Sequence, residues 1–112
     1  MDKVYNKLVR DNIPSIIEND GCKCVTKILN EKEYKVELYK KLQEETNEVI
    51  NTSNKEETLE ELADVLEVVK AIAILNNKDL NDIIEIASQK RLKRGGFEKR
   101  IFLERVQGMK WY

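Results

Sequence analysis

Two short acidic segments of this chain have the residue types and the spacing of a metal site. The first, EETNE, supplies Glu44, Glu45 and Glu48, and the second, ELAD, supplies Glu61 and Asp64. Glu45 and Glu48, and likewise Glu61 and Asp64, are three positions apart, so each pair projects from one face of a helix. Two antiparallel helices would bring four carboxylates together in an oxygen-only site, which suits Mg²⁺ or Mn²⁺ better than a soft metal. The chain has no histidine, which excludes imidazole zinc sites and His-based acid/base catalysis.

The position of these acids on their helices strengthens the metal interpretation. Glu45 falls in the middle of an apolar stripe, with Glu48 at its edge, and Glu61 continues a second apolar row that Asp64 borders. The stripe consists of Tyr34, Leu38, Leu42 and Val49, and the row of Val65, Val68 and Ile72. An ionised carboxylate that faces a core is costly unless it is paired or bound to a metal. Placement alone leaves a solvated acidic face as an equal alternative.

Four helices are predicted to position these side chains. Their expected ranges are 13–20, 31–51, 55–75 and 80–94. Asn30 with Glu33, and Asn54 with Glu57, have the spacing of N-terminal caps, and Gly21 and Gly95 follow the first and last helices. Short polar turns between helices predict an all-α antiparallel bundle in a single domain, 1–112. The alternating segments VYNKLV and CKCVTKIL also predict a minor β element near the N-terminus.

Composition narrows the classes of partner. The 112 residues carry 20 Lys plus Arg and 21 Asp plus Glu, a net charge of -1, which gives no case for binding nucleic acid or an acidic membrane. No apolar run is long enough to span a membrane, and the start lacks a signal-peptide pattern, so we expect a cytoplasmic protein. Cys22 and Cys24 are expected to be reduced thiols.

The charges are unevenly distributed along the chain. Nine acids and one base lie in 44–67, whereas eight bases and two acids lie in 90–110. Lys90 and Arg94 are aimed partly inward and are the preferred phosphate contacts, with solvated cations at a helix C-terminus as the alternative. Lys7 and Arg10 could also reach the site, or form a structural ion pair.

Three residues beyond the acids have open roles. Gly96 follows Gly95 at the expected helix stop, where a close backbone approach to a phosphate is the minority interpretation. Phe97 and Trp111 are assigned to packing in a core or dimer rather than to stacking on a base.

Three motifs, taken in order, resemble one superfamily. EETNE, twelve residues and then ELAD match the E-E-x-x-E … E-x-x-D signature of the MazG-like all-α nucleoside triphosphate pyrophosphohydrolases. NKLVRDNIP and KRGGFEKRIFLE are similar to the flanking segments of a house-cleaning branch of that superfamily. The resemblance implies hydrolysis of a nucleoside triphosphate to nucleoside monophosphate and pyrophosphate with Mg²⁺, or Mn²⁺, as cofactor. It casts Glu45, Glu48, Glu61 and Asp64 as metal ligands and Glu44 as the group that orients or deprotonates water.

Two alternatives remain open. Phosphoribosyl-ATP pyrophosphohydrolase shares the fold and the acids, although the KLVRD and RGGF flanks favour the house-cleaning branch. A non-enzymatic helical interaction module is the other, and the core-facing acids argue against it because such a helix would carry Leu or Ile there. The broad apolar arc of 55–75 on a small chain, together with the resemblance, predicts a homodimer or higher homo-oligomer.

Overall fold

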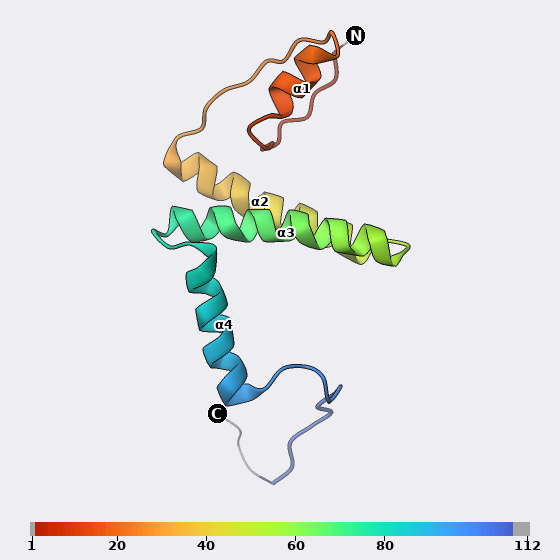
Figure 1. Ribbon diagram of the computed structural model, residues 1–112, viewed down its shortest axis with the longest axis vertical. Coiled ribbons are helices and arrows are strands. Elements are labelled where there is room, and N and C mark those ends of the chain that lie inside the picture. Colours follow the sequence, from red (N-terminus) through yellow and green to blue (C-terminus); the bar gives the residue numbers. More distant parts are fainter. Residues whose placement is uncertain (1, 109–112) are drawn as a thin grey trace. The chain divides into compact units, whose positions relative to one another are not determined.

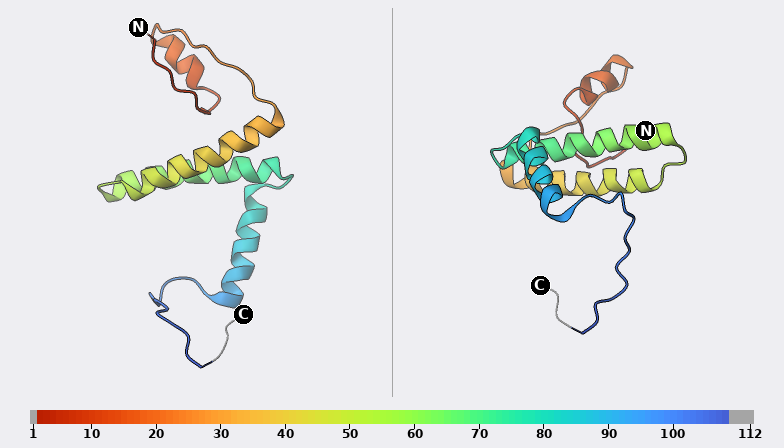
Figure 2. Two further views of the ribbon diagram at one scale, coloured as in Figure 1. Left: turned by 180° about the vertical axis from the view of Figure 1, so that it is seen from behind. Right: turned by 60° about the horizontal axis from the view of Figure 1, so that its bottom comes forward.

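The computed structural model describes residues 2–108, and within them the chain is all-α (Figure 1; Figure 2). The four helices are α1 (Ile13–Asn19), α2 (Glu31–Ile50), α3 (Lys55–Leu75) and α4 (Leu80–Arg94). The predicted fold class is confirmed, and each helix begins and ends within one residue of its predicted bounds.

Two long helices, α2 and α3, form an antiparallel hairpin, and they are the helix pair in contact within the described residues (Figure 2). Asn30 and Glu33 form a reciprocal capping box at the start of α2, in which Asn30 Oδ1 accepts from Glu33 N at 2.8 Å. Asn54 Oδ1 caps α3 by accepting from Glu57 N at 2.9 Å. Both predicted caps are therefore present, and they fix where the helices begin.

The contact between α2 and α3 buries few side chains. Leu38 on α2 and Val68 and Ala73 on α3 are the buried apolar residues of the described chain. A second row on α3 stays exposed: Leu59, Leu62 and Leu66 keep 57%, 47% and 49% of their accessible surface. The broad apolar arc predicted for 55–75 is therefore only partly covered, because within residues 2–108 α3 contacts one helix, α2.

The predicted β element is wrong, because residues 2–108 contain no strand. The alternation in 22–29 would need a partner to cover one face. Val25 and Ile28, which point to opposite sides of such a strand, are both almost fully exposed. An unpaired extended segment gains no ladder hydrogen bonds and no cross-strand packing.

The chain divides into two compact units, one ending at Leu80 and one beginning at Asn81. The second unit holds nearly all of α4, which stops at Gly95, where a φ of +81° favours glycine. The Arg91 guanidinium pairs with Glu98 at 2.6 Å. A Cβ at Gly96 would run into both side chains, so Gly96 leaves room for that pair. Among the described residues, no helix is long and apolar enough to cross a membrane.

Candidate metal centre

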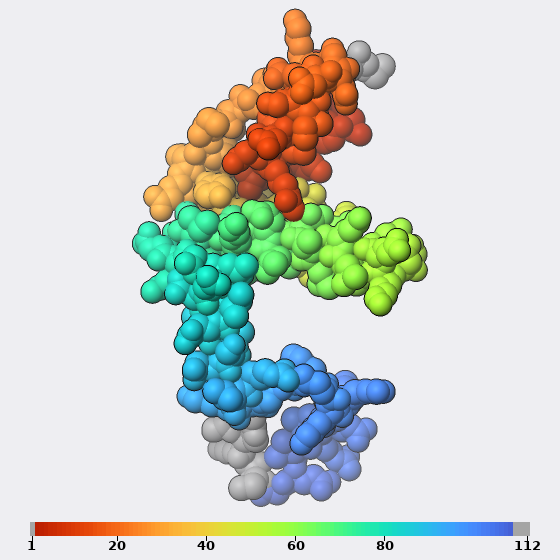
Figure 3. All heavy atoms as spheres, in the orientation of Figure 1, coloured from red at the N-terminus to blue at the C-terminus, as the bar shows by residue number. Residues whose placement is uncertain are grey.

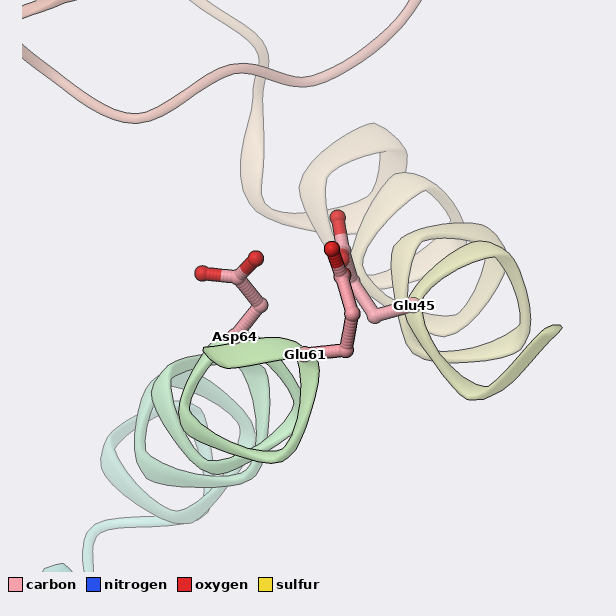
Figure 4. Close-up of side chains that lie close together, drawn as sticks. All are labelled: Glu45, Glu61 and Asp64. Atoms are coloured by element: carbon pink, nitrogen blue, oxygen red, sulfur yellow. The ribbon is translucent and has the colours of Figure 1, made fainter. Parts of the chain in front are cut away.

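Three carboxylates converge on one side of the hairpin. Glu45 on α2 and Glu61 and Asp64 on α3 each offer an oxygen, and these oxygens lie within 4.8 Å of one another. All three side chains are half-buried and project to the same side of the two helices (Figure 4). We call these residues the acid cluster.

Helix geometry explains why the acid cluster forms. Glu45 follows the buried Leu38 by two turns on α2, and Glu61 precedes the buried Val68 by two turns on α3. Residues seven positions apart lie on nearly the same face of a helix. The contact that buries Leu38 and Val68 therefore also brings the two glutamates face to face.

The acid cluster carries charge that is not fully compensated. The pKa of Glu61 is raised, first by partial burial and then by the negative charges of Asp64, Glu48 and Glu45. A carboxyl whose pKa rises because other carboxylates surround it is stabilised by any cation that enters the cluster.

Two other predicted acids lie beside the acid cluster rather than in it. Glu48 is exposed and outside the group of three, although its charge contributes to the raised pKa of Glu61. Glu44 is half-buried, and its Oε1 accepts from Lys7 Nζ at 3.5 Å and from Lys41 Nζ at 3.3 Å.

Cations reach these acids from two directions. Arg10 Nη2 donates to Asp64 Oδ1 at 2.6 Å, and Lys7 pairs with Glu44, so both predicted N-terminal cations contact acids of the hairpin. Lys41 was missed by the sequence analysis. Its Nζ lies 3.5 Å from Glu45 and 3.3 Å from Glu44, and its side chain is only 17% exposed. The spacing of three and four residues to these glutamates is the signal that identifies it.

The predicted phosphate contacts belong to the second unit. Lys90 and Arg94 are exposed on α4, in a stretch whose last turn also contains Arg91 and Lys93. Phe97 is 97% exposed, so it does not pack in a core of the described chain. Trp111 lies outside the described residues.

The sequence matches a known protein family over most of its helical part. The sequence model of the family described as phosphoribosyl-ATP pyrophosphohydrolase matches residues 17–91, which span α2, α3 and the whole acid cluster. The comparisons with curated proteins and with solved structures gave no match.

Proposed function

The chain belongs to the phosphoribosyl-ATP pyrophosphohydrolase family, and we propose that it hydrolyses the α–β phosphoanhydride bond of a nucleoside triphosphate. The products are a nucleoside monophosphate and pyrophosphate. The observation that carries this proposal is the acid cluster, which lies inside the matched residues and joins acids from two helices. A helix hairpin that served only as an interaction module would have no use for three half-buried acids at its contact.

The donor set fits a hard divalent cation. All three donors are carboxylate oxygens within 4.8 Å of one another, and Glu48 adds a fourth acid at the edge. Mg²⁺ and Mn²⁺ prefer such ligands. Glu45, Glu61 and Asp64 would hold the ion, with Glu48 completing the set predicted from the sequence. When bound, the ion would neutralise phosphate charge and lower the pKa of a coordinated water.

Other side chains are assigned to positioning water and to binding phosphate. We assign Glu44 to orienting the attacking water, because it is next in sequence to Glu45 and its Oε1 is held by Lys7 and Lys41. Fixing that carboxylate lowers the entropy lost when water is placed for in-line attack. Arg10 of the N-terminal segment is assigned to the substrate phosphates, because cations stabilise the negative charge of the transferring group. For Lys90 and Arg94, which belong to the second unit, that role stays a prediction from the sequence.

Two substrates are candidates. The motifs that favour a modified nucleoside triphosphate, in 6–14 and 93–104, lie outside the matched residues 17–91, so the match does not weigh against them. The description of the family favours phosphoribosyl-ATP. Both contain a triphosphate, and the same cut releases pyrophosphate from either.

A substrate panel tests the proposal. Pyrophosphate release should be measured with Mg²⁺ on the four common nucleoside triphosphates, on oxidised or deaminated ones, and on phosphoribosyl-ATP. The house-cleaning function predicts the highest kcat/KM on a modified nucleotide. If kcat/KM is highest on phosphoribosyl-ATP, the chain is a phosphoribosyl-ATP pyrophosphohydrolase instead. No pyrophosphate release from any of these substrates would refute both functions.

We also propose that a second copy of the chain covers the exposed row of α3. Leu59, Leu62 and Leu66 share one face of that helix and remain about half exposed, while few side chains of the described chain are buried. A contiguous apolar helix face of this kind marks an interface. Light scattering on the eluting protein should give a dimer or larger, and Leu62→Glu should lower that mass. A wild-type monomer would overturn the proposal.

A further inference from the structure

The N-terminal segment before α1, residues 2–12, is tied to the acids of the hairpin by two ion pairs. Arg10 Nη2 contacts Asp64 Oδ1 at 2.6 Å across 54 positions of sequence, and Lys7 Nζ contacts Glu44 Oε1 at 3.5 Å across 37. Figure 3 shows this segment, in red, reaching the green and yellow helices of the hairpin. Asn6 has a φ of +46°, a conformation that asparagine tolerates, and it turns the chain just before Lys7.

The two cations are paired with acids of different kinds. Asp64 is a member of the acid cluster, whereas Glu44 is not. Arg10 is therefore paired with a carboxylate that a metal ion in the cluster would also bind. Lys7 is paired with a carboxylate outside the cluster.

The charged side chains in and beside the acid cluster have a net negative charge. Lys7, Arg10 and Lys41 pair with Glu44, Glu45 and Asp64. Glu48 and Glu61 have no ion pair among those of the described residues, and the charge of Glu48 helps to raise the pKa of Glu61, after partial burial and the charge of Asp64. Three cations against five carboxylates leave two negative charges, so the surroundings of the cluster attract a divalent cation even while Arg10 is in place.

We propose that Arg10 is an exchangeable counter-ion of Asp64: it competes with the divalent cation for this carboxylate and moves to a substrate phosphate when the cation enters. This inference rests on the proposed function. Both side chains are about half exposed, 55% for Arg10 and 40% for Asp64, so the pair is weak enough to exchange. The guanidinium fork suits a phosphate as well as a carboxylate, so Arg10 leaves one anion for another.

If Arg10 exchanges in this way, replacing it should strengthen the binding of metal and weaken the binding of nucleotide. Arg10→Gln removes the competitor, so Mn²⁺ alone should bind the full-length variant up to about fivefold more tightly, the upper range for an exposed ion pair. The same variant should have a higher KM for the nucleotide at saturating metal, because a phosphate contact is lost. An ion pair with a purely structural role would give no gain in metal affinity.

Calorimetric titration with MnCl₂, in the absence of nucleotide, tests this. Arg91→Gln is the matched control, because Arg91 makes an exposed pair of the same 2.6 Å length with Glu98, outside the acid cluster. Arg91→Gln should leave Mn²⁺ affinity unchanged, and Arg10→Lys should restore wild-type affinity because it retains the charge. Equal or weaker binding by Arg10→Gln would overturn the exchange alone, and a wild-type protein that binds no Mn²⁺ would overturn the metal site as well.

Trypsin provides a second measurement on the unmodified protein. Trypsin must bind the guanidinium of Arg10 to cleave after it, and the ion pair with Asp64 competes for that group. Mn²⁺ should therefore increase cleavage after Arg10 relative to cleavage after Lys27, whose side chain is 77% exposed. An unchanged ratio between these two sites, in protein that binds Mn²⁺, would contradict the release of Arg10.

Discussion

Glu45→Gln separates a metal ligand from a structural acid. The substitution keeps the size of the side chain and removes its charge. Glu45 is 12% exposed, its oxygen lies within 4.8 Å of oxygens of both Glu61 and Asp64, and Lys41 Nζ lies 3.5 Å away. Its charge is therefore attracted by one neighbour and repelled by two.

These three interactions leave a small net repulsion. In a water-like dielectric, unit charges 3.5 Å and 4.8 Å apart interact by about 1 kcal/mol each, so two repulsions against one attraction leave a net repulsion of about 1 kcal/mol. The free energy of unfolding of the metal-free variant should lie within about 1 kcal/mol of wild type, which corresponds to a melting temperature within about 5 °C. Lys41 also keeps its contact with Glu44 at 3.3 Å.

Metal binding should respond much more strongly. Loss of a group that only orients a ligand typically weakens metal affinity by about 10–100-fold, so loss of a ligand itself should weaken Mn²⁺ binding at least about tenfold. Calorimetric Mn²⁺ titration and thermal melts of the same samples measure both effects. Glu60→Gln is the matched control: Glu60 is an exposed acid next to Glu61 and outside the acid cluster, so both quantities should stay at wild-type values.

Two results would refute this reasoning. Mn²⁺ affinity within about twofold of wild type would mean that Glu45 does not hold the ion. A melting temperature lowered by more than about 10 °C would mean that Glu45 is needed for folding, through Lys41, and that the charge balance is wrong.

Three further predictions concern stability. The raised pKa of Glu61 means that folding favours its protonated form, so the metal-free protein should gain stability as pH falls through that pKa towards 4.5, the ordinary value of a glutamate. Glu61→Gln should weaken this rise in a series of thermal melts. Leu38→Ala removes a side chain that is 3% exposed and should lower the free energy of unfolding in urea by about 2–4 kcal/mol, whereas Val36→Ala, at a 49% exposed position, should change it by less than about 0.5 kcal/mol. Asn30→Ala removes the capping box of α2 and should cost about 1 kcal/mol in the same urea experiment, and no measurable loss would contradict the role of the cap.

Helix positions were predictable because local signals specify them. Asn30, Asn54, Gly21 and Gly95 mark helix ends through hydrogen bonds and backbone angles that depend on a few adjacent residues. The β element was wrongly predicted because alternation in 22–29 reports only local preference. A strand also needs a partner, and a partner depends on the whole chain.

The acid cluster was partly predictable for the same reason. Periodicity placed Glu45 and Glu61 on the faces that meet, and the structure brings them together with Asp64. Whether Glu48 joins them depends on the rotation and stagger of α2 against α3, which periodicity does not fix. Ion pairs between residues far apart in the sequence are harder to predict. The contact of Arg10 with Asp64, for example, depends on the path of a segment without regular structure.

The central claim is that the acid cluster supports metal-dependent hydrolysis of a nucleotide at its α–β bond. The most direct measurement is ³¹P NMR of the products, with the protein, a triphosphate substrate and either Mg²⁺ or a chelator. If the acid cluster holds the metal, signals of nucleoside monophosphate and pyrophosphate are expected in equal amounts with Mg²⁺, with no product signal in the chelator and none from Glu45→Gln. Release of orthophosphate in place of pyrophosphate, or full activity in the chelator, would contradict it.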